Sequence, residues 1–350
     1  DPQDGHHGEA WFASTMKATN VKGNPTDDGG NAEGQSTVTI GGTEVPFVEL
    51  LENYGDTLLG EKVHREFGVT TPVISKLIDT EIRHVVQWHP TQAFAKKHFD
   101  YPWGKNEAWV ILDHRAGDRE NQRAEDPHVH LGFRHDVTDE EIDATIREGK
   151  SHKLLNLMNK IPVSIGDAVF VPAGVPHALG PGLFLIEIQE PADFLFRADR
   201  EWEAAGVTLT EEQRHLGLGY EVMLSAFDRI QCRNRDAIEK KQLFSGPNNE
   251  SAVETESHIY FNGRPDYPFG IQRVRVDSSA TIEFGDRFFN AIVIRGSGTL
   301  KGAGTSYQFK AGDGVFIPAA LDAVDLVADE PCELVLSWLD GAAATIRTES

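Results

Sequence analysis

The stretch GDAVFVPAGVPHA, from Gly166 to Ala178, decides the fold of this chain. A glycine–aspartate turn leads into a short apolar run, and Pro172 ends it because a proline cannot donate a hydrogen bond to a neighbouring strand. A second copy, GDGVFIP, ends at Pro318 and matches the first seven residues at five positions. The repeat predicts that one β-structure is built twice along the chain.

The two copies differ where the first has a histidine. The first continues through Gly174 to His177, whereas the second continues PAALDA and has Ala323 at that position. The spacing G-x5-P-x-G-x2-H resembles the second motif of the cupin superfamily, whose members form small antiparallel barrels. We therefore predict two barrels, of which the first holds a metal and the second is metal-free.

The rest of the chain alternates between strand-like and helix-like segments. Apolar residues at helical spacing predict a helix over about 45–67, and Thr138 with Glu141 and Thr210 with Gln213 form capping boxes that open further helices. Short alternating runs predict strands within 73–89, 108–112 and 163–197 and from about 269 onward, and polar loops over 20–36 and 113–127.

These elements predict a mainly β fold of two cupin (jelly-roll) barrels with an inserted helical region. We assign residues 1–130 and 161–200 to the first barrel, 131–160 and 201–245 to helical segments, and 246–350 to the second barrel. A length of 350 residues also favours more than one domain.

Composition excludes several classes of function. A formal net charge of −22 argues against nucleic acid or an anionic membrane as a partner. We find no apolar run of membrane-spanning length and no signal-peptide pattern. Cys232 and Cys332 are too few for a disulfide framework and favour reduced thiols in the cytoplasm. The sequence begins at Asp1, so we expect part of the natural N-terminus to be absent from it.

Ligands on one strand must be two residues apart to share a face, and two segments satisfy this requirement. Gln87 and His89 are one pair, and Lys105 and Glu107 are another. With His177 they would give two imidazoles and one carboxylate, with Gln87 as a neutral fourth ligand. Such a set leaves positions open for water or substrate, as a catalytic divalent metal requires.

His128 and His130 have the same spacing and form a competing pair. They follow a long polar loop and have no acidic partner at strand spacing, so we interpret them as polar residues near the domain surface. His135, His152 and His215 lie in helical or loop context and are expected at the surface.

Several segments, in order along the chain, resemble type I phosphomannose isomerases, which are zinc-dependent cupin enzymes. The resemblance covers about residue 8 to residue 340 and rests on segments that look like the family motifs: Gly8–Trp11 (GEAW), Pro72–Lys76 (PVISK), Gln87–Pro90 (QWHP), Lys105–Trp109 (KNEAW), Pro172–Ala178 (PAGVPHA), Glu187–Gln189 (EIQ) and Asp193–Arg197 (DFLFR).

The resemblance implies that the protein interconverts mannose 6-phosphate and fructose 6-phosphate through a cis-enediol. It implies one zinc ion per chain, bound by the residues that match the family's ligands, and it implies that Arg197 is an active-site residue. Lys76 is a candidate phosphate-binding cation. Three proton-transfer bases stay open, namely Glu187, Lys105 and a metal-bound water.

The chain departs from the family pattern at Val85, where the family has a serine at the phosphate end of the pocket. By strand alternation Val85 and Arg83 are expected on the face of Gln87, so a cation could compensate for the missing hydroxyl. The apolar run from Phe194 to Phe196 is a second departure. Two alternatives therefore remain: the same chemistry on an unphosphorylated or other sugar, or a non-catalytic bicupin that binds a sugar.

Overall fold

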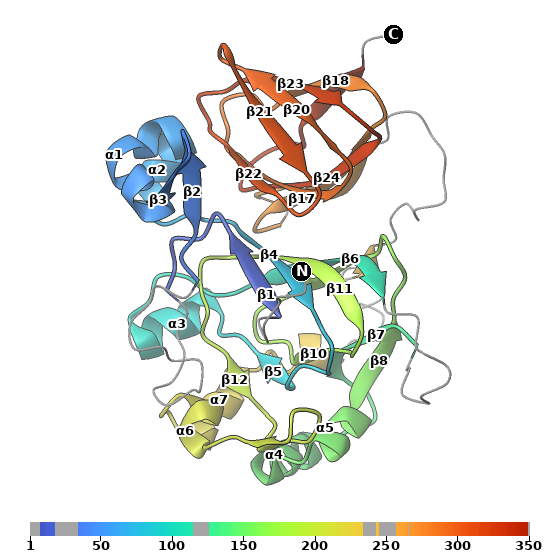
Figure 1. The fold of residues 1–350 in the computed structure, drawn as a ribbon. Coiled ribbons are helices and arrows are strands. Elements are labelled where there is room, and N and C mark those ends of the chain that lie inside the picture. The colour runs from blue at the N-terminus through green and yellow to red at the C-terminus, as the bar shows by residue number, and fades with distance from the viewer. Residues whose placement is uncertain are drawn as a thin grey trace.

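The computed structural model describes residues 8–17, 34–114, 126–233, 243–244, 257–265 and 267–348. It contains two antiparallel β-barrels, one above the other in Figure 1, with helices outside them. This confirms the mainly β, cupin-type fold. Of the two polar loops expected from the sequence, residues 20–33 and 115–125 lie outside the described residues.

Two sheets form the first barrel. The six-stranded sheet has the order β1 (Glu9–Phe12), β4 (Ile74–Asp79), β11 (Leu183–Gln189), β6 (Glu107–His114), β9 (Ala168–Val171) and β15 (Leu243–Phe244). The five-stranded sheet has the order β12 (Phe196–Arg197), β5 (Gln87–Trp88), β10 (His177–Leu179), β7 (His128–Phe133) and β8 (Met158–Pro162). Apolar residues of both sheets, among them Ile111 and Leu131, fill part of the interior.

The second barrel consists of two five-stranded sheets. One has the order β16 (Ser257–Phe261), β17 (Gly270–Val276), β24 (Cys332–Trp338), β19 (Phe289–Arg295) and β22 (Gly314–Ile317). The other has the order β21 (Thr305–Lys310), β20 (Ser297–Gly302), β23 (Ala323–Ala328), β18 (Ser279–Glu283) and β25 (Thr345–Thr348). An apolar cluster lies between them, and the fully buried Gln272 of β17 is bonded to Ala344 beside it.

The sequence repeat corresponds to one turn that is built twice. Gly166 and Gly312 both have φ of 92°, which a residue with a Cβ rarely adopts. The carboxylate of Asp167 accepts from the amide of Ser164 at 2.9 Å, and that of Asp313 accepts from the amide of Lys310 at 3.0 Å. The repeated residues therefore specify the same turn at the entry to β9 and to β22.

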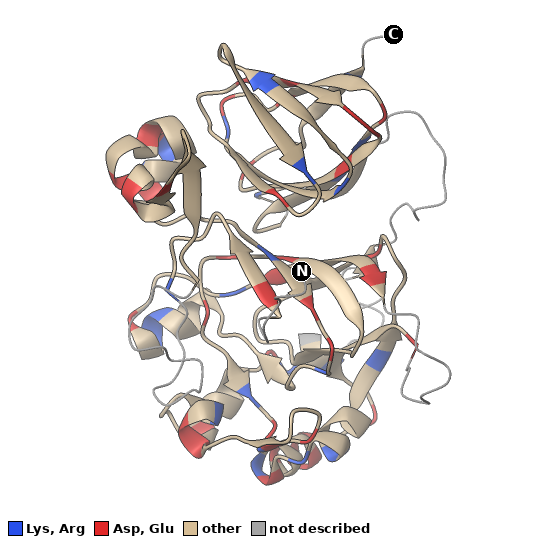
Figure 2. Cartoon of the chain, in the orientation of Figure 1, with Lys and Arg blue, Asp and Glu red and all other residues tan. Residues whose placement is uncertain are grey.

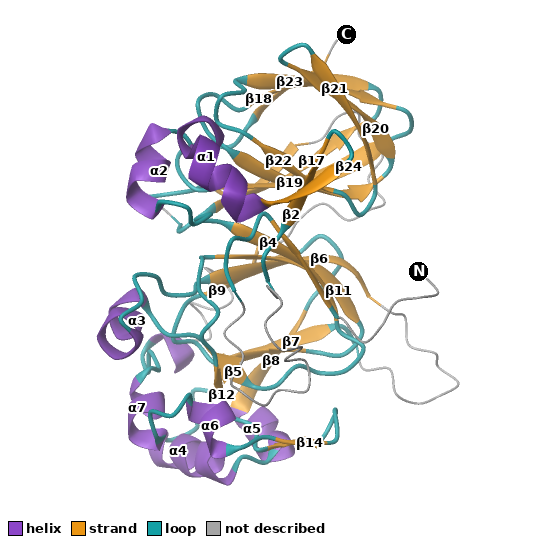
Figure 3. Cartoon of the chain, turned by 60° about the vertical axis from the view of Figure 1, so that its left-hand side comes forward, coloured by secondary structure: helices purple, strands orange, loops and turns teal. Residues whose placement is uncertain are grey.

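Helices gather in two places (Figure 3). α1 (Phe47–Leu59) and α2 (Glu61–Phe67), with the hairpin of β2 (Thr37–Ile40) and β3 (Thr43–Pro46), lie beside the second barrel. The others lie around the first barrel: α3 (Gln92–Phe99), α4 (Asp139–Glu148), α5 (Ser151–Leu157), α6 (Glu211–His215) and α7 (Tyr220–Ser225). A short ribbon of β13 (Glu201–Trp202) and β14 (Val207–Thr208) and the 3₁₀ turn η1 (Gln231–Arg233) complete this part of the chain.

Both capping boxes are confirmed at the starts of α4 and α6. The single helix expected after Thr210 is instead two short helices, because Leu216, Gly217 and Gly219 have positive φ and break the helix between them. The helical segment expected over 131–160 contains α4 and α5, but its ends belong to β7 and β8. In the described part of the chain, no helix is long and apolar enough to cross a membrane.

The two barrels pack against each other through the outer face of the six-stranded sheet of the first barrel. Its outer face carries Ile186, Ile188 and Val110, which pack in one apolar cluster with Ile271 and Val335 of the second barrel. Polar contacts cross the same boundary: the hydroxyls of Ser75 and Ser337 lie 3.2 Å apart, and the amide of Asn290 donates to the carbonyl of Val73 at 2.8 Å. The inner face of this sheet carries the site described next.

Candidate metal centre and active site

Charged and aromatic residues form a row across the inner face of the six-stranded sheet. Trp11 of β1 is paired with Lys76 of β4, Lys76 with Glu187 of β11, and Glu187 with Trp109 of β6. Directly paired residues of antiparallel strands project from the same face. Glu107 is two residues before Trp109 and shares that face.

The five-stranded sheet contributes imidazoles from the opposite side of the barrel. Gln87 is paired with both His177 and Arg197, so these three side chains share one face. His89 follows two residues after Gln87, as the strand spacing predicts. The segments expected to carry metal ligands are thus brought to one place.

His89, Glu107 and His177 form a cluster in which one ligand atom from each residue lies within 4.8 Å of the others. The Nε2 of His89 is 3.2 Å from Oε2 of Glu107, and the Nε2 of His177 is 3.2 Å from Oε1. The Nε2 of Gln87 lies 3.4 Å from the Nε2 of His177. All three members of the cluster are at most 1% exposed.

The donor atoms of this cluster fit a divalent metal. Nε2 of His89 and both carboxylate oxygens of Glu107 are buried without a hydrogen-bond partner among the described residues. Orphaned buried polar atoms cost free energy, and a cation between them would supply the missing interactions. Two imidazoles and one carboxylate are a donor set that suits a catalytic zinc or similar ion.

Carbonyl groups orient both imidazoles toward the centre. Nδ1 of His89 lies 2.9 Å from the carbonyl oxygen of Phe194, and Nδ1 of His177 lies 2.9 Å from that of Val175. A proton on Nδ1 leaves Nε2 unprotonated and free to bind a metal. Gly174 donates its amide to the carbonyl of His89 at 2.8 Å and so ties the two ligand segments together.

Electrostatics favours the metal-binding protonation states. Burial raises the pKa of Glu107, but the charges of Lys105, His89 and His177 more than offset this and hold that pKa well below its usual range. Burial lowers the pKa of His177 to about 4, against the opposing charge of Glu107. The carboxylate is therefore ionised and this imidazole neutral near pH 7.

Two buried lysines and Glu187 continue the site beyond the metal cluster. Nζ of Lys105 lies 3.1 Å from Glu107 and 3.6 Å from Glu187, and Nζ of Lys76 lies 3.2 Å from Glu187. Trp109 donates its indole N–H to Glu187 at 3.2 Å. Burial lowers the pKa of Lys105, but the carboxylates of Glu187 and Glu107 raise it by more, so the group stays an ammonium.

Glu9 and Trp11 also contact this network, although the sequence assigned no role to either. Oε2 of Glu9 is 3.5 Å from Nζ of Lys76, and that Nζ lies 3.7 Å from the centroid of the Trp11 ring. Both residues belong to the GEAW segment, which indicated only the family resemblance. Nothing in the sequence shows that this short edge strand pairs with β4.

Arg197 lies beside the metal cluster and is half-buried. It donates from Nη1 to the carbonyl of Gln213 at 2.8 Å. Burial lowers the pKa of its guanidinium, and Asp193 opposes that shift. One side of the guanidinium is thus anchored by the loop that follows Thr210, and the side chain shares the face of Gln87.

Arg83 does not lie with the other site residues. Its guanidinium donates to the hydroxyl of Ser151 at 3.0 Å and to Asp199 at 3.3 Å, outside the barrel and against α5. Residues 83–86 are not part of β5, so strand alternation does not extend back to Arg83. Val85 is buried, 7% exposed.

His128 and His130 are buried, 3% and 6% exposed, so the expectation that they lie near the surface is wrong. His130 is paired with Ala178, next to His177, and consequently projects from the face opposite to His177. They face away from the metal cluster. His135 and His152 are exposed as expected, whereas His215 is half-buried.

The second barrel has apolar residues at the positions of the ligands. In the first barrel Glu107 is paired with Val171, and the repeat places Ile317 at the position of Val171. Ile317 is paired with Phe289, so Phe289 stands where the first barrel has Glu107. It is fully buried and stacks on Trp338 at a centroid distance of 5.3 Å.

Charges elsewhere in the first barrel pair locally at the surface. Figure 2 shows acidic and basic residues side by side on the helices around α4. Arg229 pairs with Asp139 and Asp143 at 3.0 and 2.8 Å, and all three side chains are partly exposed. Such pairs contribute about 1 kcal/mol or less, so the buried charges of the barrel interior are a separate feature.

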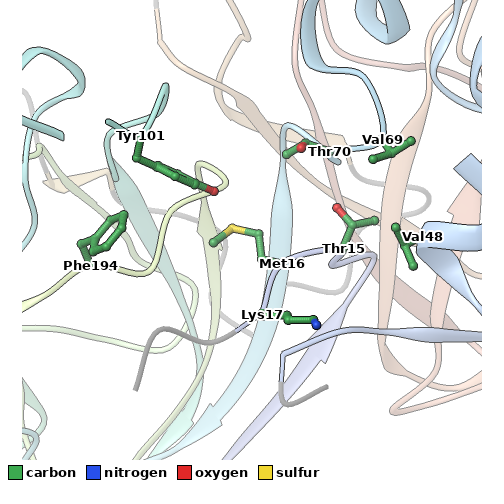
Figure 4. A pocket seen from close by; sticks show the side chains of 8 residues that line it. All are labelled: Thr15, Met16, Lys17, Val48, Val69, Thr70, Tyr101 and Phe194. Carbon is green, nitrogen blue, oxygen red and sulfur yellow. The ribbon is translucent and has the colours of Figure 1, made fainter. Parts of the chain in front are cut away.

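A cavity of about 290 Å³ is lined by segments that are far apart in the sequence (Figure 4). Figure 4 shows Tyr101 and Phe194 on one side of it and Thr70, Val69 and Val48 on the other, and Thr15, Met16 and Lys17 complete the lining. Because the carbonyl of Phe194 contacts His89, one wall of this cavity is also a support of the metal cluster.

Comparisons with known proteins agree with this architecture. A family model for the cupin domain of mannose-6-phosphate isomerase matches residues 265–338, within the second barrel. Among curated proteins, the probable mannose-6-phosphate isomerase GmuF of Bacillus subtilis is 26% identical over 270 residues, which cover 77% of this chain and 76% of that protein.

Solved structures show the same fold. A putative mannosephosphate isomerase from Archaeoglobus fulgidus matches with a TM-score of 0.68 at 20% identity and covers 95% of this chain and 88% of its own. A zinc-bound mannose 6-phosphate isomerase matches with a TM-score of 0.65 at 16% identity and covers 95% of this chain and 91% of its own.

Proposed function

The chain belongs to the type I phosphomannose isomerase family, and from that membership we propose that it interconverts mannose 6-phosphate and fructose 6-phosphate. The observation that carries the proposal is the position of the His89–Glu107–His177 cluster beside the buried charges of Lys105 and Glu187. A site that only binds a sugar has no need of this pairing of a metal centre with acid and base groups.

One zinc ion per chain is the cofactor of this proposal. His89, Glu107 and His177 would hold it, with Gln87 as a neutral fourth ligand, and the orphaned atoms of the cluster support this set. When bound, the ion stabilises negative charge that develops on the substrate oxygens at C1 and C2. A metal-free second barrel agrees with Phe289 at the position of Glu107.

The reaction moves a proton from C2 to C1 of the sugar and a hydroxyl proton from O2 to O1, through a cis-enediol. Lys105 is held as an ammonium by two carboxylates, so it is suited to donate a hydrogen bond to a substrate oxygen but not to remove a proton from carbon. Oε1 of Glu187 lies 3.6 Å from Nζ of Lys105, so a carboxylate is held beside this ammonium. We assign to Glu187 the transfer of the proton between the two carbons.

Arg197 and Lys76 complete the assignment. A guanidinium presents two parallel donors, which suits an enediolate or two adjacent substrate oxygens. The anchor at the carbonyl of Gln213 leaves other donors of Arg197 for this contact. Burial lowers the pKa of Lys76, but the carboxylates of Glu9 and Glu187 raise it by more, so the group stays an ammonium. This positive charge would attract the phosphate into a protein of net charge −22.

Steady-state kinetics on zinc-loaded protein tests this proposal. Mannose 6-phosphate and mannose are compared, with ketose formation as the measurement. We expect formation of fructose 6-phosphate with a higher kcat/KM for the phosphate ester. If fructose forms from mannose with equal or higher kcat/KM, the substrate is an unphosphorylated sugar and the chemistry is the same. If either sugar binds but no ketose forms, the protein is a binding module.

We also infer that the protein acts in the cytoplasm. Cys232 and Cys332 are both buried and free, as expected in a reducing compartment.

A further inference from the structure

Gln189 lies on the inner face of the six-stranded sheet, next to a residue of the metal cluster. It is paired with Glu107 of β6 on one side and with Ile74 of β4 on the other, and directly paired residues project from the same face. Its neighbour Ile188 packs on the outer face, and Glu187, two residues earlier, faces inward as Gln189 does. Gln189 is 0% exposed, so its side chain is buried beside a metal-binding carboxylate and on the strand of the proposed base.

Two carbonyl groups fix the orientation of the Gln189 amide. Its Nε2 donates to the carbonyl of Ala192 at 2.9 Å and to that of Glu190 at 3.2 Å. These bonds use both N–H groups of the side chain. A flipped amide would place Oε1 against two carbonyl oxygens, which repel it, so the partners define which end is the oxygen. Oε1 is therefore the end that points away from these carbonyls.

Oε1 of Gln189 is a buried acceptor without a donor. It has no hydrogen-bond partner among the described residues. Gln272 of the second barrel is equally buried, but its Nε2 donates to Ser257 and to the carbonyl of Ala344, and its Oε1 accepts from the amide of Ala344. An unpaired buried carbonyl oxygen costs free energy, so we expect a donor at Oε1 of Gln189 in the working protein.

The buried cations of the site are engaged with carboxylates. Nζ of Lys105 lies 3.1 Å from Glu107, and Nζ of Lys76 lies 3.2 Å from Glu187. Neither ammonium donates to Oε1 of Gln189. A sugar carries hydroxyl donors on several carbons, whereas a phosphate group acts mainly as an acceptor. An amide oxygen on this face is therefore suited to the sugar part of a substrate.

We propose that Gln189 is a further substrate-contacting residue, whose Oε1 accepts a hydrogen bond from a hydroxyl of the bound sugar. This inference rests on the proposed function, because it takes the substrate class from it. An acceptor that is held in one direction favours a sugar with a hydroxyl at the matching carbon, since a sugar without that hydroxyl leaves the acceptor unpaired. Gln189 thereby contributes to specificity for the sugar, separately from the cations that attract the phosphate.

A panel of deoxy analogues tests this contact. Calorimetry gives apparent dissociation constants of zinc-loaded protein for mannose 6-phosphate and for analogues that lack the hydroxyl at C1, C2, C3 or C4. In the wild type, one analogue should bind roughly 5- to 100-fold more weakly because it leaves Oε1 unpaired. Gln189→Met has no acceptor oxygen, so it should remove most of this difference for the same analogue.

Gln189→Glu is the matched control. Both variants lack the amide N–H groups that bind the carbonyl of Ala192, but only Gln189→Glu keeps an acceptor oxygen, so the difference should persist in it. If every analogue loses the same factor in the wild type and in Gln189→Met, Gln189 only holds the loop and the inference is overturned. Equal binding of all analogues by the wild type overturns it without any variant. Zinc lost from folded Gln189→Met would make Oε1 a metal ligand, which overturns it as well.

Ketose formation by the same wild-type protein separates this inference from the proposed function. Coupling between Gln189 and one hydroxyl without any ketose would overturn the proposed function and support the Gln189 contact. Ketose formation with equal losses in the wild type and in Gln189→Met would overturn only the contact. A wild-type protein that does not bind mannose 6-phosphate would overturn both.

Discussion

Oε1 of Glu107 lies 3.2 Å from Nε2 of His177 across the interior of the first barrel. The two residues come from different sheets, and neither oxygen of Glu107 has a hydrogen-bond partner among the described residues. The separation between the sheets therefore sets the size of the site, and a cation that bridges these atoms would also join the two sheets.

His177→Ala should abolish tight metal binding, because it removes one of the two imidazoles. Metal analysis of the purified protein is expected to show near-zero zinc. His130→Ala is the matched control, since it removes a buried histidine of the neighbouring strand β7 that faces the other way. Zinc occupancy unchanged in His177→Ala would show that the cluster is not the metal site.

One zinc ion per chain should be found in the wild type, and it should lie in the first barrel. Phe289 and Ala323 leave the second barrel without the carboxylate and imidazole of the first. Anomalous scattering at the zinc edge is expected to give one peak, beside Glu107. A second peak of similar occupancy between β19 and β23 would contradict this.

Arg197→Lys should lower kcat by about a hundredfold or more, because an ammonium keeps the charge but loses the planar pair of donors. Zinc content should be unchanged. Arg200→Lys serves as the control, since Arg200 is half-buried and its guanidinium pairs with Glu211 outside the site. Near-wild-type turnover of Arg197→Lys would make Arg197 a structural residue.

Val85→Ser should raise kcat/KM for mannose 6-phosphate, because valine cannot donate a hydrogen bond. A hydroxyl that reaches the phosphate would add about 1.5–3 kcal/mol. Val85→Ala is the control that removes methyl groups without adding a donor. If the wild type already prefers the phosphate ester by more than about a hundredfold and Val85→Ser brings no gain, the role inferred for Val85 is wrong.

Thr138→Ala should lower the free energy of unfolding by about 1 kcal/mol, because the Thr138 side chain accepts from the amide of Glu141 at the start of α4. Urea denaturation of metal-loaded protein measures this. Thr138→Ser keeps the cap and should stay within about 0.5 kcal/mol of the wild type. Equal stabilities of the two variants would show that the cap contributes little here.

The sequence was informative where geometry is local. Strand spacing placed Gln87 with His89, and the repeat placed one turn in two barrels, because both depend on residues close together in the chain. The capping boxes of α4 and α6 are local in the same sense, and the structure contains both.

The sequence was less informative where side-chain direction depends on tertiary contacts. Arg83 was expected to share the face of Gln87, but Asp199, more than a hundred residues later, holds it outside the barrel. Burial of His128 and His130 was likewise missed, because it depends on elements that pack against β7, among them η1, about a hundred residues later.

The apolar contact between the barrels limits which substitutions the second barrel can accept. Strands β4, β11 and β6 carry the charged residues of the site on one face and apolar residues on the other. The second barrel covers the apolar face. Its interior has Phe289 at the position of Glu107. Substitutions of the residues on β17, β19 and β24 that pack against this sheet are therefore expected to affect the site, although they lie outside the first barrel.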